Sequence, residues 1–81
     1  MPETPRPIHE IAGEIVRTWP KVNYAAAPYL GAMTALDTIS DKYGYDSCEE
    51  IVLRFLGNAT SWRGDDARRL KAELRGLLPN Y

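Results

Sequence analysis

Apolar side chains recur along this chain at three- and four-residue intervals, the spacing that places them on one face of a helix. The first such segment follows Pro7, a residue suited to the opening position of a helix, where a missing backbone N–H costs nothing. Its apolar face consists of Ile8, Ile11, Ala12, Ile15, Val16 and Trp19. Because Pro20 disfavours helical backbone in the residue before it, a helix is predicted over 7–19.

A broad apolar arc extends from Tyr29 to Tyr43 and marks a second helix. Pro28 would lie near the start of that helix. Gly44 stands directly after the arc, in the position where a left-handed glycine usually ends a helix. A helix over 28–43 is therefore predicted.

The third segment carries a helix-start signal. The carboxylate of Asp46 can cap a helix, and Glu49 three residues later can complete a capping box. An apolar stripe follows at helical spacing, made of Cys48, Ile51, Val52, Phe55 and Ala59. A helix over 47–58 is predicted, and we interpret it as the central helix on which the others pack.

The fourth apolar stripe lies near the C-terminus and is made of Ala67, Leu70, Leu74, Leu77 and Leu78. Its helix is predicted over about 62–78 and stops at Pro79. The sequence leaves open whether this helix begins at Trp62 or only after Gly64. Two aspartates follow Gly64, and negative charge there stabilises the positive end of a helix dipole.

These four segments predict an all-α protein, a small four-helix bundle of orthogonal or up-and-down type. A chain of 81 residues has room for one core, so residues 7–81 are expected to form a single domain. The Pro-rich residues 1–6 are expected to form a flexible, disordered tail. No run of alternating polar and apolar residues argues for a strand.

Bulk composition is that of an ordinary globular domain, with 44% hydrophobic and 26% charged residues. The net charge of −1 argues against a strongly basic nucleic-acid binder and against an acidic mimic of DNA. The start of the chain lacks the apolar run of a signal peptide, and no segment approaches membrane-spanning length. We therefore expect a cytoplasmic protein with no membrane partner.

Candidate catalytic side chains are few. Cys48 would lie in the first turn of a helix, where the dipole can lower a thiol pKa, but it also begins the apolar stripe of that helix. A catalytic cysteine needs a base, and His9 is the only histidine of the chain. We interpret Cys48 as a core residue and expect neither an enzymatic activity nor a cofactor.

Two carboxylate pairs have four-residue spacing, Asp37 with Asp41 and Glu10 with Glu14. Paired carboxylates without a well-placed histidine make a weak metal site. His9 is adjacent to Glu10, and neighbouring residues of a helix point in different directions. We therefore interpret both pairs as solvated surface and predict no metal site.

The tripeptide Trp62-Arg63-Gly64 joins a large aromatic ring to a permanent cation between two predicted helices. Trp and Arg are among the residues most enriched at interface hot spots. The alternative is that Trp62 packs beneath the connection as core while Arg63 pairs with Asp65 or Asp66. Both interpretations remain open at the level of the sequence.

A basic face on the last predicted helix carries Arg68, Lys71 and Arg75. Together with Arg63, and with Trp62 as a stacking platform, this face would suit an anionic ligand or a nucleic acid. Nucleic acid is the less favoured partner. The turn pattern of a helix-turn-helix is lacking, and the aspartates at the start of the helix would face the phosphates.

Tyrosines gather around the ends of the second predicted helix, at Tyr24, Tyr29, Tyr43 and Tyr45. Tyrosine suits both the edge of a bundle and a contact surface, because it combines apolar area with a hydrogen-bonding tip. The candidate interaction residues are accordingly Tyr43, Tyr45, Trp62, Arg63, Arg68, Lys71 and Arg75.

Four short motifs carry a resemblance to a group of known proteins: Tyr43-Gly44-Tyr45-Asp46, Asn58-Ala59, Trp62-Arg63-Gly64 and Leu70-Lys71-Ala72-Glu73-Leu74. Through them, residues 8–78 resemble small all-helical proteins of bacteriophage, prophage and actinobacterial genomes. Those proteins have no assigned activity, so the resemblance supplies no catalytic residue. It implies an accessory protein of a phage or mobile element.

The leading hypothesis is a small non-enzymatic helical module that binds another protein, with self-association into a homo-oligomer as one form of that binding. It rests on small size, surplus aromatic residues, balanced charge and the lack of a catalytic constellation. The alternative hypothesis is a binder of an anionic ligand or a nucleic acid that uses Trp62, Arg63 and the basic face of the last helix.

Overall fold

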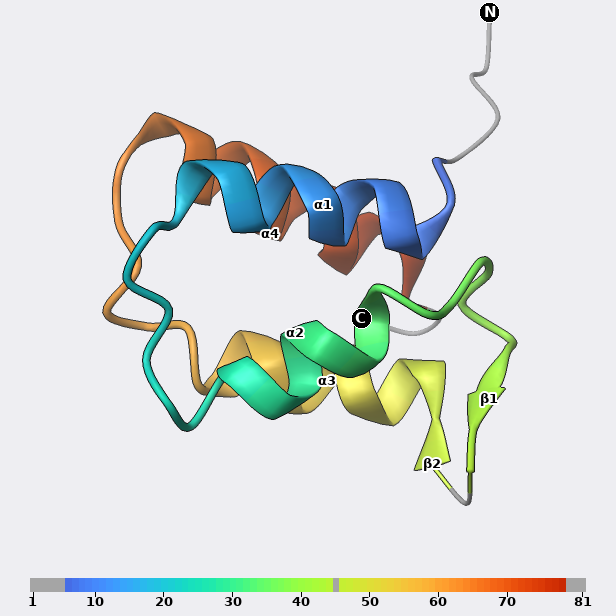
Figure 1. Ribbon diagram of the computed structural model, residues 1–81. Coiled ribbons are helices and arrows are strands. Elements are labelled where there is room, and N and C mark those ends of the chain that lie inside the picture. The colour runs from blue at the N-terminus through green and yellow to red at the C-terminus, as the bar shows by residue number, and fades with distance from the viewer. Residues whose placement is uncertain (1–5, 45, 79–81) are drawn as a thin grey trace, which may run out of the picture.

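Four helices arranged in two layers enclose the core in the described residues, 6–44 and 46–78, of this computed structural model (Figure 1). They are α1 (Ile8–Thr18), α2 (Ala27–Met33), α3 (Cys48–Gly57) and α4 (Asp65–Leu77). Helix α1 lies beside α4, and α2 lies beside α3. The expected all-α class is confirmed at this level. The predicted bounds of the first and third helices are correct to within one residue.

The core is built from the apolar stripes that the sequence predicted, with Leu30 and Met33 contributed by α2. Val16 is an exception, because it is 51% exposed although it was placed on the apolar face of the first helix. The largest fully buried side chains are Phe55, Ile8, Ile11, Ile15, Met33, Leu70, Leu74, Val52 and Cys48. Phe55 of α3 is completely enclosed, and the indole of Trp19 meets it edge-on with ring centroids 6.2 Å apart. Phe55 is therefore a core residue, as the pattern of α3 predicts.

The prediction for the second helix is wrong over its second half. Helix α2 ends at Met33 rather than at residue 43. Two tight turns follow, in which the N–H of Ala35 donates to the carbonyl of Ala32 and the N–H of Leu36 donates to that of Met33. The apolar residues beyond α2 still contribute to the core, because Leu36 is buried without being helical.

The segment after α2 satisfies the N-terminus of α1, which explains why it leaves the helix. The carbonyls of Leu36 and Asp37 accept hydrogen bonds of 2.8 Å from the backbone N–H groups of His9 and Ile8, respectively. The first N–H groups of a helix have no partner within that helix. Pro7 cannot cap them with a side chain, so the distant carbonyls take this role.

A short antiparallel hairpin that the sequence did not predict lies between α2 and α3. It pairs β1 (Lys42–Tyr43) with β2 (Asp46–Ser47). Gly44 has the left-handed conformation that was expected, with φ +65°, but it serves the hairpin turn rather than the end of a helix. Strands of two residues are too short to leave an alternating pattern in the sequence.

The cap of α3 is Ser47 and not Asp46, so the predicted capping position is one residue too early. The hydroxyl of Ser47 accepts a hydrogen bond of 3.2 Å from the N–H of Glu50. Asp46 belongs to β2, where its backbone pairs with Tyr43. The hairpin therefore decides which of two adjacent capping residues is used.

Helix α4 begins at Asp65, which settles the boundary that the sequence left open. Gly64 is its N-cap and has φ 113° and ψ 179°. This region of backbone space is open almost only to glycine. Trp62 and Arg63 accordingly belong to the connection between α3 and α4, and a helix start at residue 62 is wrong.

An ion-pair network joins α1 to α4. Glu14 of α1 accepts from Arg69 of α4 at 2.6 Å and from Arg6 at 2.9 Å, and Arg6 also pairs with Glu73 of α4 at 2.6 Å. Arg6 was expected to belong to a disordered tail, and these contacts show that it is held in place. The remainder of that predicted tail, residues 1–5, lies outside the described residues.

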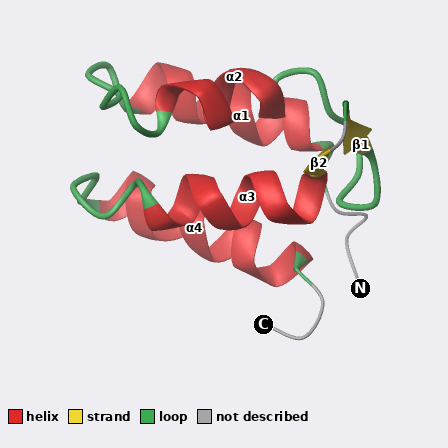
Figure 2. Ribbon diagram, turned by 90° about the horizontal axis from the view of Figure 1, so that it is seen from below, coloured by secondary structure: helices red, strands yellow, loops and turns green. Residues whose placement is uncertain are grey.

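The two ends of the molecule differ in construction (Figure 2). The hairpin lies at one end, and the α1–α2 and α3–α4 connections lie together at the other. The side-chain amide of Asn23 donates to the carbonyl of Asn58 across these two connections at 2.8 Å. The side-chain oxygen of Asn23 accepts a hydrogen bond from the N–H of Ala26, also at 2.8 Å. Within residues 6–44 and 46–78, no helix is long and apolar enough to cross a membrane.

Replacement of Phe55 by alanine should lower the free energy of unfolding by about 3–5 kcal/mol, because it removes a fully buried ring and leaves a cavity. Urea unfolding followed by circular dichroism measures the change. Leu53→Ala is the matched control, since Leu53 lies on the same helix but is 46% exposed. Near-equal stability of the two variants would show that α3 is not central to the core.

Gly64→Ala should destabilise the fold by about 1–3 kcal/mol through backbone strain. Apart from the two chain neighbours, no residue has an atom within 4 Å of the position of the new Cβ, so strain is the main cost. The control is Gly13→Ala in α1, where the new Cβ meets only the flexible Arg17 guanidinium at 3.7 Å. That variant should gain about 0.5–1 kcal/mol. Equal stabilities of the two variants would contradict the conformation of Gly64.

Glu14→Gln should destabilise the protein at neutral pH and flatten its acid unfolding. Hydrogen bonds from Arg69 and then Arg6 lower the pKa of Glu14. A carboxylate with a lowered pKa contributes stability above its unfolded value of about 4.3, and this contribution is lost as pH falls through the folded value. Urea unfolding from pH 7 to pH 2 should therefore show the two proteins converging in acid. Glu10→Gln is the matched control, because Glu10 is exposed on the same helix and forms no ion pair within the described residues, so its replacement should change stability at neutral pH little.

Candidate anion-binding site

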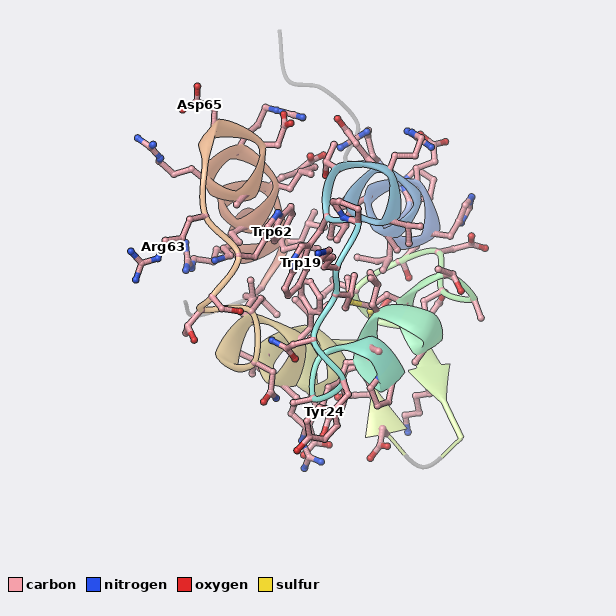
Figure 3. The ribbon with its side chains drawn as sticks, turned by 60° about the vertical axis from the view of Figure 1, so that its left-hand side comes forward. Trp19, Tyr24, Trp62, Arg63 and Asp65 are labelled. Atoms are coloured by element: carbon pink, nitrogen blue, oxygen red, sulfur yellow. The ribbon has the colours of Figure 1, made fainter. Side chains whose placement is uncertain are left out.

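Trp62 is a core residue that fixes the connection between α3 and α4. Its side chain is only 5% exposed, and its indole stacks on that of Trp19 with centroids 5.0 Å apart and planes inclined by 5° (Figure 3). The core interpretation of Trp62 is thus correct. A base cannot stack on this ring without displacing its neighbours, so the proposed stacking platform is wrong.

Arg63 follows the buried Trp62 and is exposed, with its side chain directed away from the core in Figure 3. The predicted pairing of Arg63 with Asp65 or Asp66 is not observed. Those aspartates pair instead with Arg68 at 3.4 Å and Arg69 at 3.1 Å, respectively.

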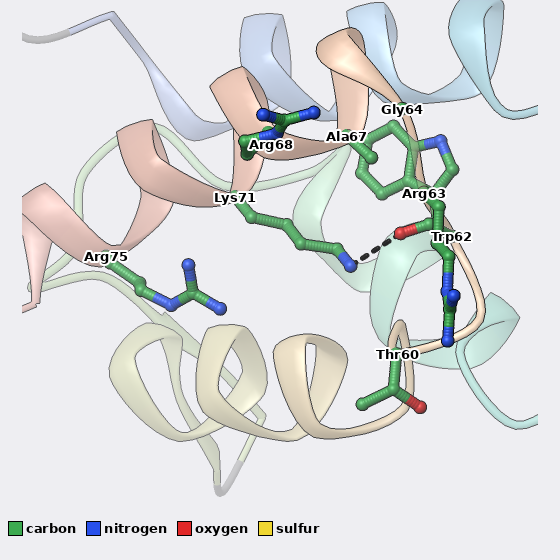
Figure 4. A pocket seen from close by; sticks show the side chains of 8 residues that line it. All are labelled: Thr60, Trp62, Arg63, Gly64, Ala67, Arg68, Lys71 and Arg75. Carbon is green, nitrogen blue, oxygen red and sulfur yellow. Dashed lines mark hydrogen bonds between the residues drawn. The ribbon is translucent and has the colours of Figure 1, made fainter.

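A cavity of about 330 Å³ opens beside this connection and along α4 (Figure 4). Its lining residues come from the α3–α4 connection and from one face of α4. They are Thr60, Trp62, Arg63, Gly64, Ala67, Arg68, Lys71 and Arg75. Half of these residues are cationic and none is acidic. The structure therefore brings together all four basic residues that the sequence analysis singled out.

The helical repeat explains why these cations share one face. Arg68, Lys71 and Arg75 are separated by three and four residues, which places them above one another along α4. The apolar residues Leu70 and Leu74 lie on the buried side of the same helix. The buried Trp62 anchors the connection, so that the adjacent Arg63 joins the helical cations at the mouth of the cavity.

Arg69 is directed to a different side of α4 and does not line the cavity. It pairs with Glu14 of α1 at 2.6 Å and with Asp66 at 3.1 Å. Of the basic residues of α4, Arg69 is therefore neutralised by α1, and the other three line the cavity.

Lys71 occupies the inner part of the basic group. Its Nζ donates a hydrogen bond of 2.7 Å to the carbonyl oxygen of Trp62 and lies 5.7 Å from the centroid of the Trp62 ring (Figure 4). Burial lowers the pKa of Lys71, and the neighbouring charges of Arg75 and Arg63 lower it further. The ammonium group is thus held among like charges in a partly desolvated position.

The positive charge of the cavity is weakly compensated by the protein itself. Arg68 pairs with Asp65 at 3.4 Å, but both side chains are more than four-fifths exposed, and such surface pairs contribute little. Over the described part of the chain, no carboxylate forms an ion pair with Arg63, Lys71 or Arg75. An anion in the cavity would supply the missing counter-charge.

Cys48 and His9, the candidate catalytic residues of the sequence, have structural roles. Cys48 is fully buried, and burial, with smaller contributions from Asp41 and Glu49, raises the pKa of its thiol to about 11. Its interpretation as a core residue is therefore correct. The Nδ1 atom of His9 lies 2.8 Å from Oδ1 of Asp37 and so ties the start of α1 to the segment after α2.

The solvated-surface interpretation of the carboxylate pairs is correct for Glu10, which is exposed on α1, and for Asp37, which is exposed although it is not helical. Asp41 and Glu14 differ, because both accept hydrogen bonds. Asp37 and Asp41 lie beyond the end of α2, and the Asp41 carboxylate accepts from the N–H groups of Thr38 and Asp37 at 3.1 and 3.0 Å. These hydrogen bonds lower the pKa of Asp41. Glu14 is engaged by arginines, as described above. Within the described ranges, no cluster of three His, Cys, Asp or Glu side chains could hold a metal ion.

Of the tyrosines near the second predicted helix, the structure describes the side chains of Tyr24 and Tyr29. Tyr45 lies outside the described residues, as does the side chain of Tyr43. Tyr24 is 91% exposed in the α1–α2 connection (Figure 3). Because Trp62 is buried, it cannot supply an exposed aromatic anchor between them.

Sequence reasoning missed the contributions of Thr60, Gly64 and Ala67 to the cavity. Gly64 carried a usable signal, since a glycine directly before a predicted helix can adopt a backbone conformation closed to other residues. No protein-family model matches the chain, and neither a curated protein nor a solved structure matches it significantly.

Proposed function

We propose that this protein binds a small anionic ligand, carrying a phosphate group, in the cavity between α4 and the α3–α4 connection. The observation that carries the proposal is the gathering of Arg63, Arg68, Lys71 and Arg75 around one cavity whose lining includes no acidic residue. On this proposal the scaffold is a small four-helix bundle, and the rest of the fold serves to hold these cations together.

Phosphate is favoured over carboxylate by the residue types and by the charge. The planar guanidinium presents paired N–H donors that match phosphate oxygens, and the lysine ammonium adds a compact point charge. Three guanidinium groups and one ammonium group line the cavity. A dianionic phosphate offsets more of this charge than a single carboxylate does.

A small ligand fits this site better than an extended nucleic acid. The cavity volume of about 330 Å³ lies at the lower end of the range of ligand pockets. Asp65 and Asp66 stand at the adjacent helix start, where they would repel a continuing chain of phosphates. The buried and stacked Trp62 offers no platform for a base.

Protein binding and self-association remain predictions, as do a phage or mobile-element role and a cytoplasmic location. The large apolar side chains with the greatest exposure among the described residues are Val16, Tyr24 and Leu53. They belong to α1, to a connection and to α3, and apolar residues scattered in this way are normal on a monomer. Light scattering of the purified chain would test self-association directly.

Inorganic phosphate should bind the wild-type protein and raise its melting temperature, because a ligand that binds only the folded state stabilises it. Isothermal titration calorimetry and thermal unfolding measure the two effects. Arg75→Gln should weaken binding about tenfold, since a hydrogen bond to a charged group contributes about 1.5 kcal/mol or more.

The matched control for this experiment is Arg17→Gln. It removes the same charge from an exposed position on α1, outside the cavity, and should leave phosphate binding unchanged. Sodium chloride at equal ionic strength controls for general screening. Equal loss of binding in both variants, or equal stabilisation by chloride and phosphate, would refute a specific site.

A further inference from the structure

Lys71 differs from the other lysines of the chain in its surroundings. Lys21 follows α1 and Lys42 lies in β1, and both are exposed. Lys71 lines the cavity, and its Nζ is held by a hydrogen bond of 2.7 Å to the carbonyl oxygen of Trp62. It is thus the lysine placed beside the proposed anion site.

The neutral form of Lys71 is more favourable than the neutral form of an exposed lysine, because of the surroundings of the amine. Burial disfavours a charged amine, and the charges of Arg75 and Arg63 add to that effect, so the pKa of Lys71 is lowered. A neutral amine has two N–H groups and one lone pair. One N–H can keep the hydrogen bond to Trp62, which leaves the lone pair available as a nucleophile.

We propose that Lys71 is a modification site, acylated on Nζ by acyl phosphates that the basic cavity binds through their phosphate group. This inference rests on the proposed function, because the arginines that hold a phosphate would bring the attached carbonyl carbon to the amine. An acyl phosphate combines the anion that suits the cavity with an electrophile that suits a lysine.

The reaction balances without an oxidant or a further reactant. The neutral amine attacks the carbonyl carbon and forms a C–N bond. The C–O bond to the phosphate group then breaks, and inorganic phosphate leaves with the bonding electron pair. The extra proton on nitrogen passes to the departing phosphate. Arg63 and Arg75 would stabilise the negative charge that develops on the leaving group.

Acylation would also change the site itself. The product amide is neutral, so the cavity would lose one of its four cations. The Trp62 carbonyl could still accept a hydrogen bond from the single remaining N–H. Modification of Lys71 would therefore weaken later phosphate binding while leaving the fold intact.

The test is to incubate the full chain with acetyl phosphate and to follow acetylation of each lysine by mass spectrometry. Lys71 should react about tenfold faster than Lys21 and Lys42, because binding raises the local concentration of the reagent. Inorganic phosphate should slow Lys71 alone. Arg75→Gln should slow Lys71 as well, whereas Arg17→Gln should not.

A second reagent separates this inference from the proposed function. The acetyl ester of N-hydroxysuccinimide has no phosphate group. It can therefore share the part of the Lys71 preference that comes from the lowered pKa, but not the larger part that comes from phosphate binding. If phosphate binds in calorimetry but acetyl phosphate does not favour Lys71, the modification site is refuted and the anion site stands. If phosphate neither binds nor protects Lys71, both proposals are refuted.

Discussion

The stacking of Trp62 on Trp19 is the contact on which both the core and the candidate site depend. Trp19 is the C-cap of α1 and meets Phe55 of α3 edge-on, while Trp62 belongs to the α3–α4 connection. The two indoles thus join segments that are distant in the sequence. Because Trp62 is fixed in the core, the residues on either side of it have defined positions. The carbonyl oxygen of Trp62 accepts a hydrogen bond from Lys71, and the side chain of the next residue, Arg63, points away from the core.

The second constraint is the separation of charge around α4. On the side of the helix that faces α1, Glu14 pairs with Arg69, and Arg6 pairs with Glu73. The cavity side has no comparable acidic partner in the described ranges, although like charges four residues apart destabilise a helix slightly. A protein that needed this surface only for solubility would gain by interspersing carboxylates there. The proposed ligand would supply the counter-charge that this side of α4 lacks.

The local pattern of apolar residues was sufficient to predict most of the helices. The features that it did not predict depend on contacts between distant parts of the chain. The stripes of α1, α3 and α4 are complete within single segments, so their helices were predictable. The end of α2 was not predictable from its own segment, because the carbonyls of Leu36 and Asp37 accept hydrogen bonds from the first N–H groups of α1. The cap of α3 moved to Ser47 for a related reason, since pairing with Tyr43 places Asp46 in a strand.

The candidate site also has a part that the sequence predicted and a part that depends on a distant contact. The spacing of Arg68, Lys71 and Arg75 was enough to predict that they share one face of a helix. That prediction needed no knowledge of which residues contact them in the fold. The direction of Trp62 depended on Trp19, whose proximity no local signal reveals. The burial of Trp62 changes the chemistry that the tripeptide can perform. An exposed ring would have favoured stacking on a base, whereas a buried ring holds a carbonyl against an amine and leaves recognition to charge. The same residues thus favour a compact anion over a nucleic acid.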